Sequence, residues 1–409
     1  MKRYAIVGAG SRGLYMYAVP IHEKFRDVAK IAGVYDPNYK RAELLKRRAG
    51  GDFKVYNSFD EMLDDSKPDV VIVTTVDRYH HEYIIRALEA GCDAITEKPM
   101  TIDEEKCNMI LEAEKKTGKK VIVTFNLRCS PFSAKMKELL GDGVIGEALS
   151  IHFEWLLDTV HGADYFRRWH RRLENSGGLL VHKATHHFDL INWLIEQEPV
   201  AVNAYGERRF YGPTTDRRGQ RCLTCGYKDT CSFYLDISSL PALKELYLDC
   251  EDVDGYFRDS CVFSDEIDIF DTMSLNVKYS GGAMMSYSLT AYSPYEGYRL
   301  SINGTSGRLE AETFVGNTSK MFAGASVNRL RVYNKRGEEI VINVPIFTGG
   351  HGGADEVLQR LLFRGGPDPL NYVAGSRAGA MSLIIGAAAN RSIQEGRAVF
   401  IRDLLKDIG

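Results

Sequence analysis

The chain has 409 residues, of which 44% are hydrophobic, and its 52 Lys and Arg nearly balance its 55 Asp and Glu, giving a formal net charge of -3. This length is sufficient for a sizeable core and predicts two domains. The charge balance lacks the basic excess typical of nucleic-acid binders, and no apolar run approaches the roughly 18 residues that span a bilayer. The N-terminus runs into a glycine turn without a cleavage-like site. We therefore expect a cytoplasmic protein with no nucleic-acid or membrane partner.

The first 125 residues alternate short apolar runs with amphipathic segments. Nearly continuous apolar runs are typical of strands buried on both faces, and strands separated by helices form parallel sheets with right-handed crossovers. The sequence thus predicts a doubly wound α/β domain of the Rossmann type over residues 1–125, with strands at 4–7, 30–35, 69–74, 94–96 and 120–124 and a helix at 83–90.

The pattern changes after Asn126, where helical and strand-like segments no longer alternate regularly. Residues 126–409 are expected to form an α+β domain on a mostly antiparallel open sheet. An irregular insertion at about 207–262 interrupts this domain. Helices are expected at 186–195, 355–363 and 374–395, and strands at 274–279 and 283–289.

A glycine motif follows the first expected strand. Gly8, Gly10 and Gly13 form G-x-G-x-x-G, which permits a tight turn, close approach of a pyrophosphate and close packing of the next helix. Ser11 and Arg12 lie within this turn. Asp36 ends the second strand, where a carboxylate can accept from a ribose 2′-hydroxyl but repels a 2′-phosphate. The motif predicts NAD as the cofactor, and Arg12 leaves NADP possible.

A lysine follows the fourth strand in the triplet Glu97-Lys98-Pro99. Ligands of open α/β sheets bind at the carboxyl ends of the strands, so Lys98 is expected near the nicotinamide. Burial there would lower the pKa of its amine and let it exchange a proton with a hydroxyl or carbonyl oxygen. The alternative is that Lys98 is an ordinary surface lysine in a loop.

Several motifs together resemble the Gfo/Idh/MocA family of sugar and polyol oxidoreductases. They are the glycine turn, Thr74-Thr75 with His80, the Glu97-Lys98-Pro99 triplet, and Ser176-Gly177-Gly178-Leu179-Leu180 leading to His186 and Asp189. The resemblance covers essentially the whole chain. It implies that Thr74, Thr75, His80 and Glu97 border the cofactor. It also implies a second domain whose open sheet faces the nicotinamide and often forms a homodimer or homotetramer contact.

The resemblance also points to a catalytic pair. Members of the family commonly place an Asp and a His four residues apart after the Gly-Gly pair, and here that register gives His182 and His186. Residues four apart share one helix face, so both rings could point into the cleft. We expect His186 to accept the proton with Lys98. His182 replaces the usual Asp and cannot be a permanent anion, so its role stays open.

Candidate substrate residues lie in three segments. Residues 161–170 supply donors and stacking faces that suit a sugar ring, although a packed aromatic segment with solvated arginines is the alternative. Two side chains after the fifth strand, Asn126 and Arg128, can reach the same cleft. Lys183 and His187, near His186, either bind substrate hydroxyls or face the core. The candidates are His161, Tyr165, Arg168, Trp169, Asn126, Arg128, Lys183 and His187, with His351 as a weaker one.

Four cysteines are candidates for a metal site. Cys222, Cys225, Cys231 and Cys261 could supply four thiolates, and a subset of the resembled family carries a similar run. Thiolate tetrads suit structural zinc, with an iron–sulfur cluster as the lesser option and Cys250 as a rival fourth ligand. The remaining alternative is a set of reduced cysteines without metal.

The expected activity is reversible oxidation of a secondary hydroxyl on a sugar, glycoside or cyclitol, with hydride transfer to or from NAD(P). Three alternatives remain open. One is a redox-assisted glycoside-cleaving enzyme with tightly bound NAD, the second is a non-catalytic NAD(P)-binding sensor or regulator, and the third is a reductase of non-sugar carbonyls.

Overall fold

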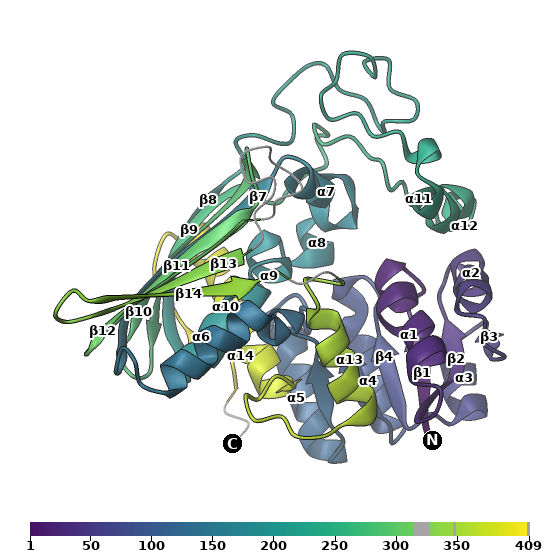
Figure 1. Cartoon of the computed structure of the whole chain (residues 1–409). Coiled ribbons are helices and arrows are strands. Elements are labelled where there is room, and N and C mark those ends of the chain that lie inside the picture. Colours follow the sequence, from purple (N-terminus) through teal and green to yellow (C-terminus); the bar gives the residue numbers. More distant parts are fainter. Residues whose placement is uncertain (315–326, 347–348, 407–409) are drawn as a thin grey trace.

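The structure, a computed structural model, describes residues 1–314, 327–346 and 349–406 and is built on two sheets (Figure 1). The seven-stranded sheet contains the N-terminal strands, and the nine-stranded sheet belongs to the second half of the chain. Helices pack between and around the sheets. No helix in the described ranges is long and apolar enough to cross a membrane.

The first sheet has the strand order β15-β6-β5-β4-β1-β2-β3, and all its pairings are parallel except that of β15 with β6. Every residue of β4 is buried, as its apolar run predicts. The strands are β1 (Lys2–Val7), β2 (Ala29–Tyr35), β3 (Lys54–Tyr56), β4 (Val70–Val73), β5 (Asp93–Thr96), β6 (Val121–Val123) and β15 (Ala374–Gly375).

Helices between these strands begin at side-chain caps. Asn38, Ser58 and Asp103 each accept a hydrogen bond from a backbone N–H of the first turn that they precede. The helices are η1 (Gly13–Ala18), α1 (Val19–Lys24), α2 (Tyr39–Ala49), α3 (Phe59–Ser66), α4 (His80–Glu89) and α5 (Glu104–Thr117). The late helix α13 (Ala354–Arg364) also packs here, since its Phe363 joins the cluster of Tyr4 and Phe25.

The second sheet is antiparallel except for the parallel pair β7–β10. Burial alternates along β9 and β10, so one face packs on helices and the other is open. The helices on the packed face include α6 (Pro131–Gly141), α10 (Thr185–Ile195) and α14 (Ser376–Glu395) (Figure 1). The strands are β7 (Ala148–Asp158), β8 (Pro199–Glu207), β9 (Thr272–Tyr279), β10 (Met284–Ser293), β11 (Gly297–Gly304), β12 (Gly307–Phe314), β13 (Val327–Asn334), β14 (Glu339–Pro345) and β16 (Val399–Phe400).

The insertion between β8 and β9 reaches back to the first domain. It carries α11 (Pro241–Leu246) and α12 (Glu251–Asp254), which stand above α2 in Figure 1. Two ion pairs with α2 hold them there, Arg41–Asp254 at 2.6 Å and Lys40–Asp252 at 2.7 Å. The insertion therefore bridges the two halves of the molecule.

The predicted zinc site is not found in the insertion. All eight cysteines are free thiols, and the described residues contain no group of three or more His, Cys, Asp or Glu side chains placed to hold a metal. Buried Cys222 instead accepts a hydrogen bond from Arg167 at 3.2 Å. The segment is held by ion pairs from buried Arg221 to Asp259 at 2.7 Å and to Glu251 at 2.9 Å. These ion pairs supply the cross-link for which the sequence interpretation invoked a metal at Cys222, Cys225, Cys231 and Cys261.

Candidate active site

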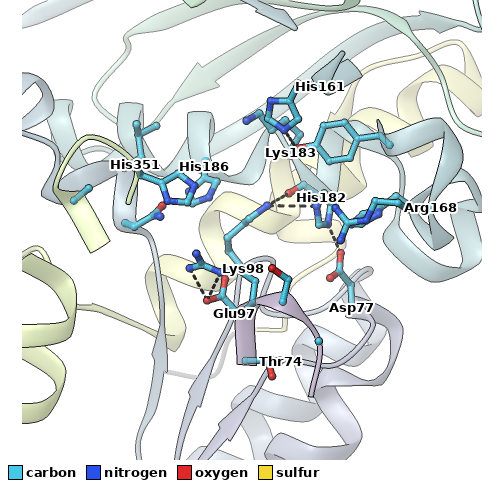
Figure 2. A pocket seen from close by; sticks show the side chains of 18 of the residues that line it. Thr74, Asp77, Glu97, Lys98, His161, Arg168, His182, Lys183, His186 and His351 are labelled. Carbon is cyan, nitrogen blue, oxygen red and sulfur yellow. Dashed lines mark hydrogen bonds and ion pairs between the residues drawn. The ribbon is translucent and has the colours of Figure 1, made fainter. Parts of the chain in front are cut away.

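A cavity of about 1640 Å³ lies between the two sheets. Its floor is the carboxyl edge of the parallel sheet, and its far wall is formed by the second domain (Figure 2). Its lining includes Asp36 and Lys98 from the first domain and Trp155 from the second. The space is large enough for a dinucleotide with a small second ligand.

The glycine turn forms one end of the cavity. Gly8 has a φ of +96°, and a Cβ there would lie 2.6 Å from the carbonyl carbon of Thr74. A Cβ on Gly13 would lie 2.3 Å from the Gly8 carbonyl oxygen. A Cβ on Gly10, in contrast, would meet nothing within 4 Å, although Gly10 lines the cavity. This open space beside the turn fits the close approach of a pyrophosphate.

We predict that Gly10→Ala folds normally and binds NAD at least about tenfold more weakly, a loss of about 1.4 kcal/mol. The added methyl group has room in the protein but occupies the space of the phosphates. Calorimetry with NAD and a thermal melt measure the two properties. Gly141→Ala is the matched control, because its Cβ also meets nothing within 4 Å and Gly141 does not line the cavity. Unchanged NAD affinity in Gly10→Ala would contradict the placement of the phosphates.

Asp36 lies at the cavity end of β2. Its two carboxylate oxygens accept from Ala9 N–H at 2.6 Å and Asn38 N–H at 2.7 Å. These bonds hold the carboxylate toward the cavity, where it fits a ribose hydroxyl. Burial raises the pKa of Asp36, and the two backbone bonds oppose that rise.

Four other residues expected at the cofactor form hydrogen bonds between separate loops. They are Arg12, Thr74, His80 and Glu97. Thr74 donates to the Gly8 carbonyl at 2.6 Å, and the ring nitrogens of His80 lie 2.9 Å from the Pro99 carbonyl and 3.1 Å from that of Thr75. Glu97 accepts from Arg12 at 2.8 Å and from Tyr17 at 2.7 Å. Because Arg12 is paired with Glu97, it is not a free cation placed for a 2′-phosphate. The residues of this group that line the cavity are Gly8, Ser11, Arg12, Thr74, Thr75, His80 and Glu97.

Lys98 projects into the cavity from the loop after β5 (Figure 2). Its Nζ donates to the His182 carbonyl at 3.0 Å and lies 3.4 Å from His182 Nε2. Burial, reinforced by the nearby Lys183, lowers the pKa of Lys98 to about 7. An amine with this pKa exchanges protons readily near neutral pH.

The sequence predicted that His182 and His186 share one helix, but they lie on two separate helices. α9 (Leu179–His182) ends at His182, and α10 begins at Thr185. Both rings nevertheless line the cavity (Figure 2). His186 packs edge-on against Phe125 at 5.9 Å, and its buried Nδ1 has no hydrogen-bond partner among the described residues. Burial lowers the pKa of His186 well below its usual value, so the ring is a neutral proton acceptor.

The far wall combines aromatic faces with polar groups. His161, at the start of α7 (His161–Arg167), contacts Glu296 at 2.8 Å and the Tyr165 hydroxyl at 3.0 Å. The ammonium of Lys183 lies 5.0 Å from the Trp155 ring centroid. The predicted substrate residues that line this part of the cavity are His161, Tyr165, Arg168, Trp169, Lys183 and His187, with Asn126 and His351 nearer the glycine turn.

Two family models cover most of the chain. An oxidoreductase-family NAD-binding Rossmann fold matches residues 2–125, and the C-terminal alpha/beta domain of the same family matches residues 137–401. The chain belongs to the Gfo/Idh/MocA oxidoreductase family. It is therefore an NAD-binding oxidoreductase, and the expected fold class is confirmed.

Individual Gfo/Idh/MocA proteins show how far the similarity extends. YteT of Bacillus subtilis, named only as an oxidoreductase, is 40% identical over 99% of both chains. The D-glucoside 3-dehydrogenase of Escherichia coli is 31% identical over 36% of this chain and 40% of its own. An Agrobacterium radiobacter oxidoreductase, solved with NAD+, L-tartaric acid and magnesium, has a TM-score of 0.67 over 99% of both chains at 17% identity, a likeness of fold.

Sequence reasoning from the Gfo/Idh/MocA motifs missed two acidic residues. Asp77, in the short helix η2 (Asp77–Tyr79) after β4, lies with Oδ2 2.5 Å from His182 Nδ1. The available signal was its position just beyond Thr74-Thr75 at the carboxyl edge of the sheet. Glu296, the partner of His161, was also missed, because it lies in a turn between β10 and β11 far along the chain.

Arg128 is the one predicted substrate residue that the structure places elsewhere. Its guanidinium forms two hydrogen bonds with the Asp189 carboxylate, at 2.7 and 2.5 Å, and a third with the Asn371 carbonyl at 2.9 Å. It is buried and does not line the cavity. The short helix η3 (Asn126–Cys129) turns Asn126 toward the cavity and Arg128 away from it.

Proposed function

We propose that the protein transfers a hydride between NAD and a secondary hydroxyl of a sugar, glycoside or cyclitol. The observation that carries this proposal is the buried Lys98 amine, with a pKa of about 7, in the cavity between the glycine turn and the polar aromatic wall. NAD is favoured over NADP because the Asp36 carboxyl group, held toward the cavity by two backbone N–H groups, suits a ribose hydroxyl, and because Arg12 is paired with Glu97.

The protein residues handle the proton of the reacting hydroxyl. NAD, when bound, supplies the nicotinamide carbon that accepts or gives the hydride. Neutral Lys98 hydrogen-bonds to the hydroxyl oxygen, and neutral His186 accepts its proton as the carbonyl forms. In the reverse direction neutral Lys98 donates a hydrogen bond to the carbonyl oxygen, and His186, protonated in the oxidation step, returns that proton.

The substrate class follows from the far wall. Tyr165 and Trp169 offer flat faces, while His161, Lys183 and Arg168 offer donors at several positions. A ring with several hydroxyls satisfies both features. The name of the related D-glucoside 3-dehydrogenase supports the same class.

The test is a panel of sugars, glycosides and cyclitols incubated with NAD and followed at the NADH absorbance. We expect turnover with at least one ring that carries free secondary hydroxyls. Simple aldehydes and ketones supplied with NADH form the comparison set. Turnover confined to that set would favour a reductase of non-sugar carbonyls instead.

A second candidate is a redox-neutral reaction in which NAD stays bound, such as redox-assisted glycoside cleavage. The insertion favours it, because Tyr247, Asp254 and Tyr256 line the cavity together with Asp36 and Arg41, and the Arg41–Asp254 ion pair joins the insertion to α2. A wall at the end expected to hold the adenosine slows release of the cofactor.

We expect the purified protein to keep NAD through gel filtration and Asp254→Asn to release it faster, because the ion pair with Arg41 is lost. Stopped-flow displacement by a fluorescent NAD analogue measures the release rate. Asp229→Asn, an exposed change in the same insertion, is the control. Fast release from the unmodified protein, together with accumulation of NADH, would exclude the redox-neutral reaction.

We also propose self-association through the open face of the nine-stranded sheet. Its exposed residues carry ion pairs between strands, such as Arg299–Glu154 at 3.2 Å and Arg299–Glu312 at 2.9 Å. Light scattering of the purified protein would distinguish a dimer or tetramer from a monomer.

A further inference from the structure

The imidazole of His182 lies between the Lys98 amine and a buried carboxylate, that of Asp77. Asp77 comes from the first domain, just after β4, and His182 from the second, at the end of α9. The Asp77 Oδ2 to His182 Nδ1 distance is 2.5 Å, and His182 Nε2 lies 3.4 Å from Lys98 Nζ (Figure 2). A continuous series of contacts therefore joins Asp77, His182 and Lys98, which come from three separate segments.

We propose that Asp77 and His182 act as a carboxylate–imidazole pair that positions Lys98 and sets its charge. Asp77 is then a positioning residue that acts through His182. The proposal rests on the proposed function only in giving Lys98 a catalytic task.

The proposed pair assigns one tautomer to the His182 ring. An ionised carboxylate is an acceptor only, so an ionised Asp77, which the nearby Lys98 and Arg168 favour, pairs with a His182 ring that is protonated on Nδ1. Nε2 then has a free lone pair, which faces Lys98 Nζ and can accept its hydrogen. The His182 carbonyl accepts a second hydrogen of the same amine at 3.0 Å. Lys98 is thus held at two points by one residue, and its neutral and charged forms both fit.

The surroundings hold the His182 ring in place. Tyr165 and Trp169 pack edge-on against it, with ring centroids 5.5 and 5.8 Å away, and His170 lies 4.1 Å away. Both Asp77 and His182 are buried. A ring enclosed in this way keeps its orientation when its partner is changed conservatively.

The charged and titratable groups that face the pair come from every element around it. Lys98 and Glu97 lie after β5, Arg168 follows α7, His170 lies in η4 (Trp169–Arg171), and Lys183 follows His182. Burial raises the pKa of Asp77 well above its usual value, and the positive charges of Lys98 and Arg168 oppose that rise. Burial lowers the pKa of His182, and the three cations Lys98, Arg168 and Lys183 lower it further. The negative charge of Asp77 in turn raises the pKa of Lys98.

The decisive variant is Asp77→Asn, which keeps the shape and removes the charge. An amide can donate to Nδ1 and move the ring proton to Nε2, where it would face the Lys98 amine unfavourably. We expect kcat/KM for a substrate found in the panel to fall about 100-fold, within the range for lost acid–base function. Asp64→Asn, an exposed change in α3 of the same domain, is the matched control.

A readout without substrate tests Lys98 directly. Trace acetylation over a range of pH, quantified at Lys98 by peptide mass spectrometry with saturating NAD, gives the titration midpoint of this amine. Asp77→Asn is expected to move the midpoint to lower pH, because the variant lacks the charge that raises the pKa of Lys98. Asp64→Asn should leave the midpoint unchanged. An unchanged midpoint in Asp77→Asn overturns the proposal even if activity is lost.

A double variant tests whether Asp77 acts through the ring. In a His182→Gln background, Asp77→Asn should cause little further loss of kcat/KM, since the link to Lys98 is already broken. Two losses that multiply in the double variant would contradict a shared path. NAD affinity and the melting temperature, measured for each variant, exclude unfolding as the cause. Absence of turnover with every substrate would contradict the proposed function, and the acetylation midpoint would still decide this proposal.

Discussion

Lys98→Met is expected to lower the rate of hydride transfer at least about 100-fold while NAD still binds. Methionine fills a similar volume but can neither donate to the reacting oxygen nor hold a proton. The side chain reaches the cavity from the loop after β5, whereas the glycine turn follows β1 and Asp36 follows β2, so the substitution leaves these expected cofactor contacts intact. Steady-state kinetics with a substrate from the panel and calorimetry with NAD measure the two effects separately.

The pH profile of the unmodified enzyme provides a check on the same residue. Since burial lowers the pKa of Lys98 to about 7, the neutral amine needed for hydroxyl oxidation forms as the pH rises through that value. Oxidation should therefore rise through about pH 7, and the step should be absent from the residual activity of Lys98→Met. Lys135→Met, at a half-exposed lysine on α6 that does not line the cavity, is the control. An unchanged rate in Lys98→Met would remove Lys98 from the chemistry.

The parallel sheet could be predicted closely because its strands carry their own signal. β1, β2, β4, β5 and β6 are apolar runs between helices, and each lies within one or two residues of its expected limits. β3 and β15 were missed because they are three and two residues long and are paired only through tertiary contacts. The antiparallel sheet was anticipated from the alternation in β9 and β10.

The candidate site could be predicted only where a motif marked it. Gly10 and Lys98 were found because local spacing identifies a turn and a strand end. Asp77 and Glu296 were not, because their partners His182 and His161 lie 105 and 135 residues away in sequence. The cysteines misled the interpretation for the opposite reason, since close spacing suggested a cluster that folding does not form.

Arg128→Met should destabilise the fold by about 3–5 kcal/mol, because it leaves the buried Asp189 carboxylate without its partner. The same change should barely alter NAD affinity or kcat/KM, as Arg128 does not line the cavity. Denaturant unfolding measures the free energy of unfolding, and kinetics below the melting range measure kcat/KM. Arg402→Met, an exposed arginine, is the control. Arg128→Met combined with Asp189→Leu should regain much of the stability, since two apolar side chains leave no charge uncompensated. A stable Arg128→Met variant with a raised KM would instead indicate that Arg128 binds the substrate. The variant therefore distinguishes a structural role of Arg128, in its ion pair with Asp189, from a role in sugar binding.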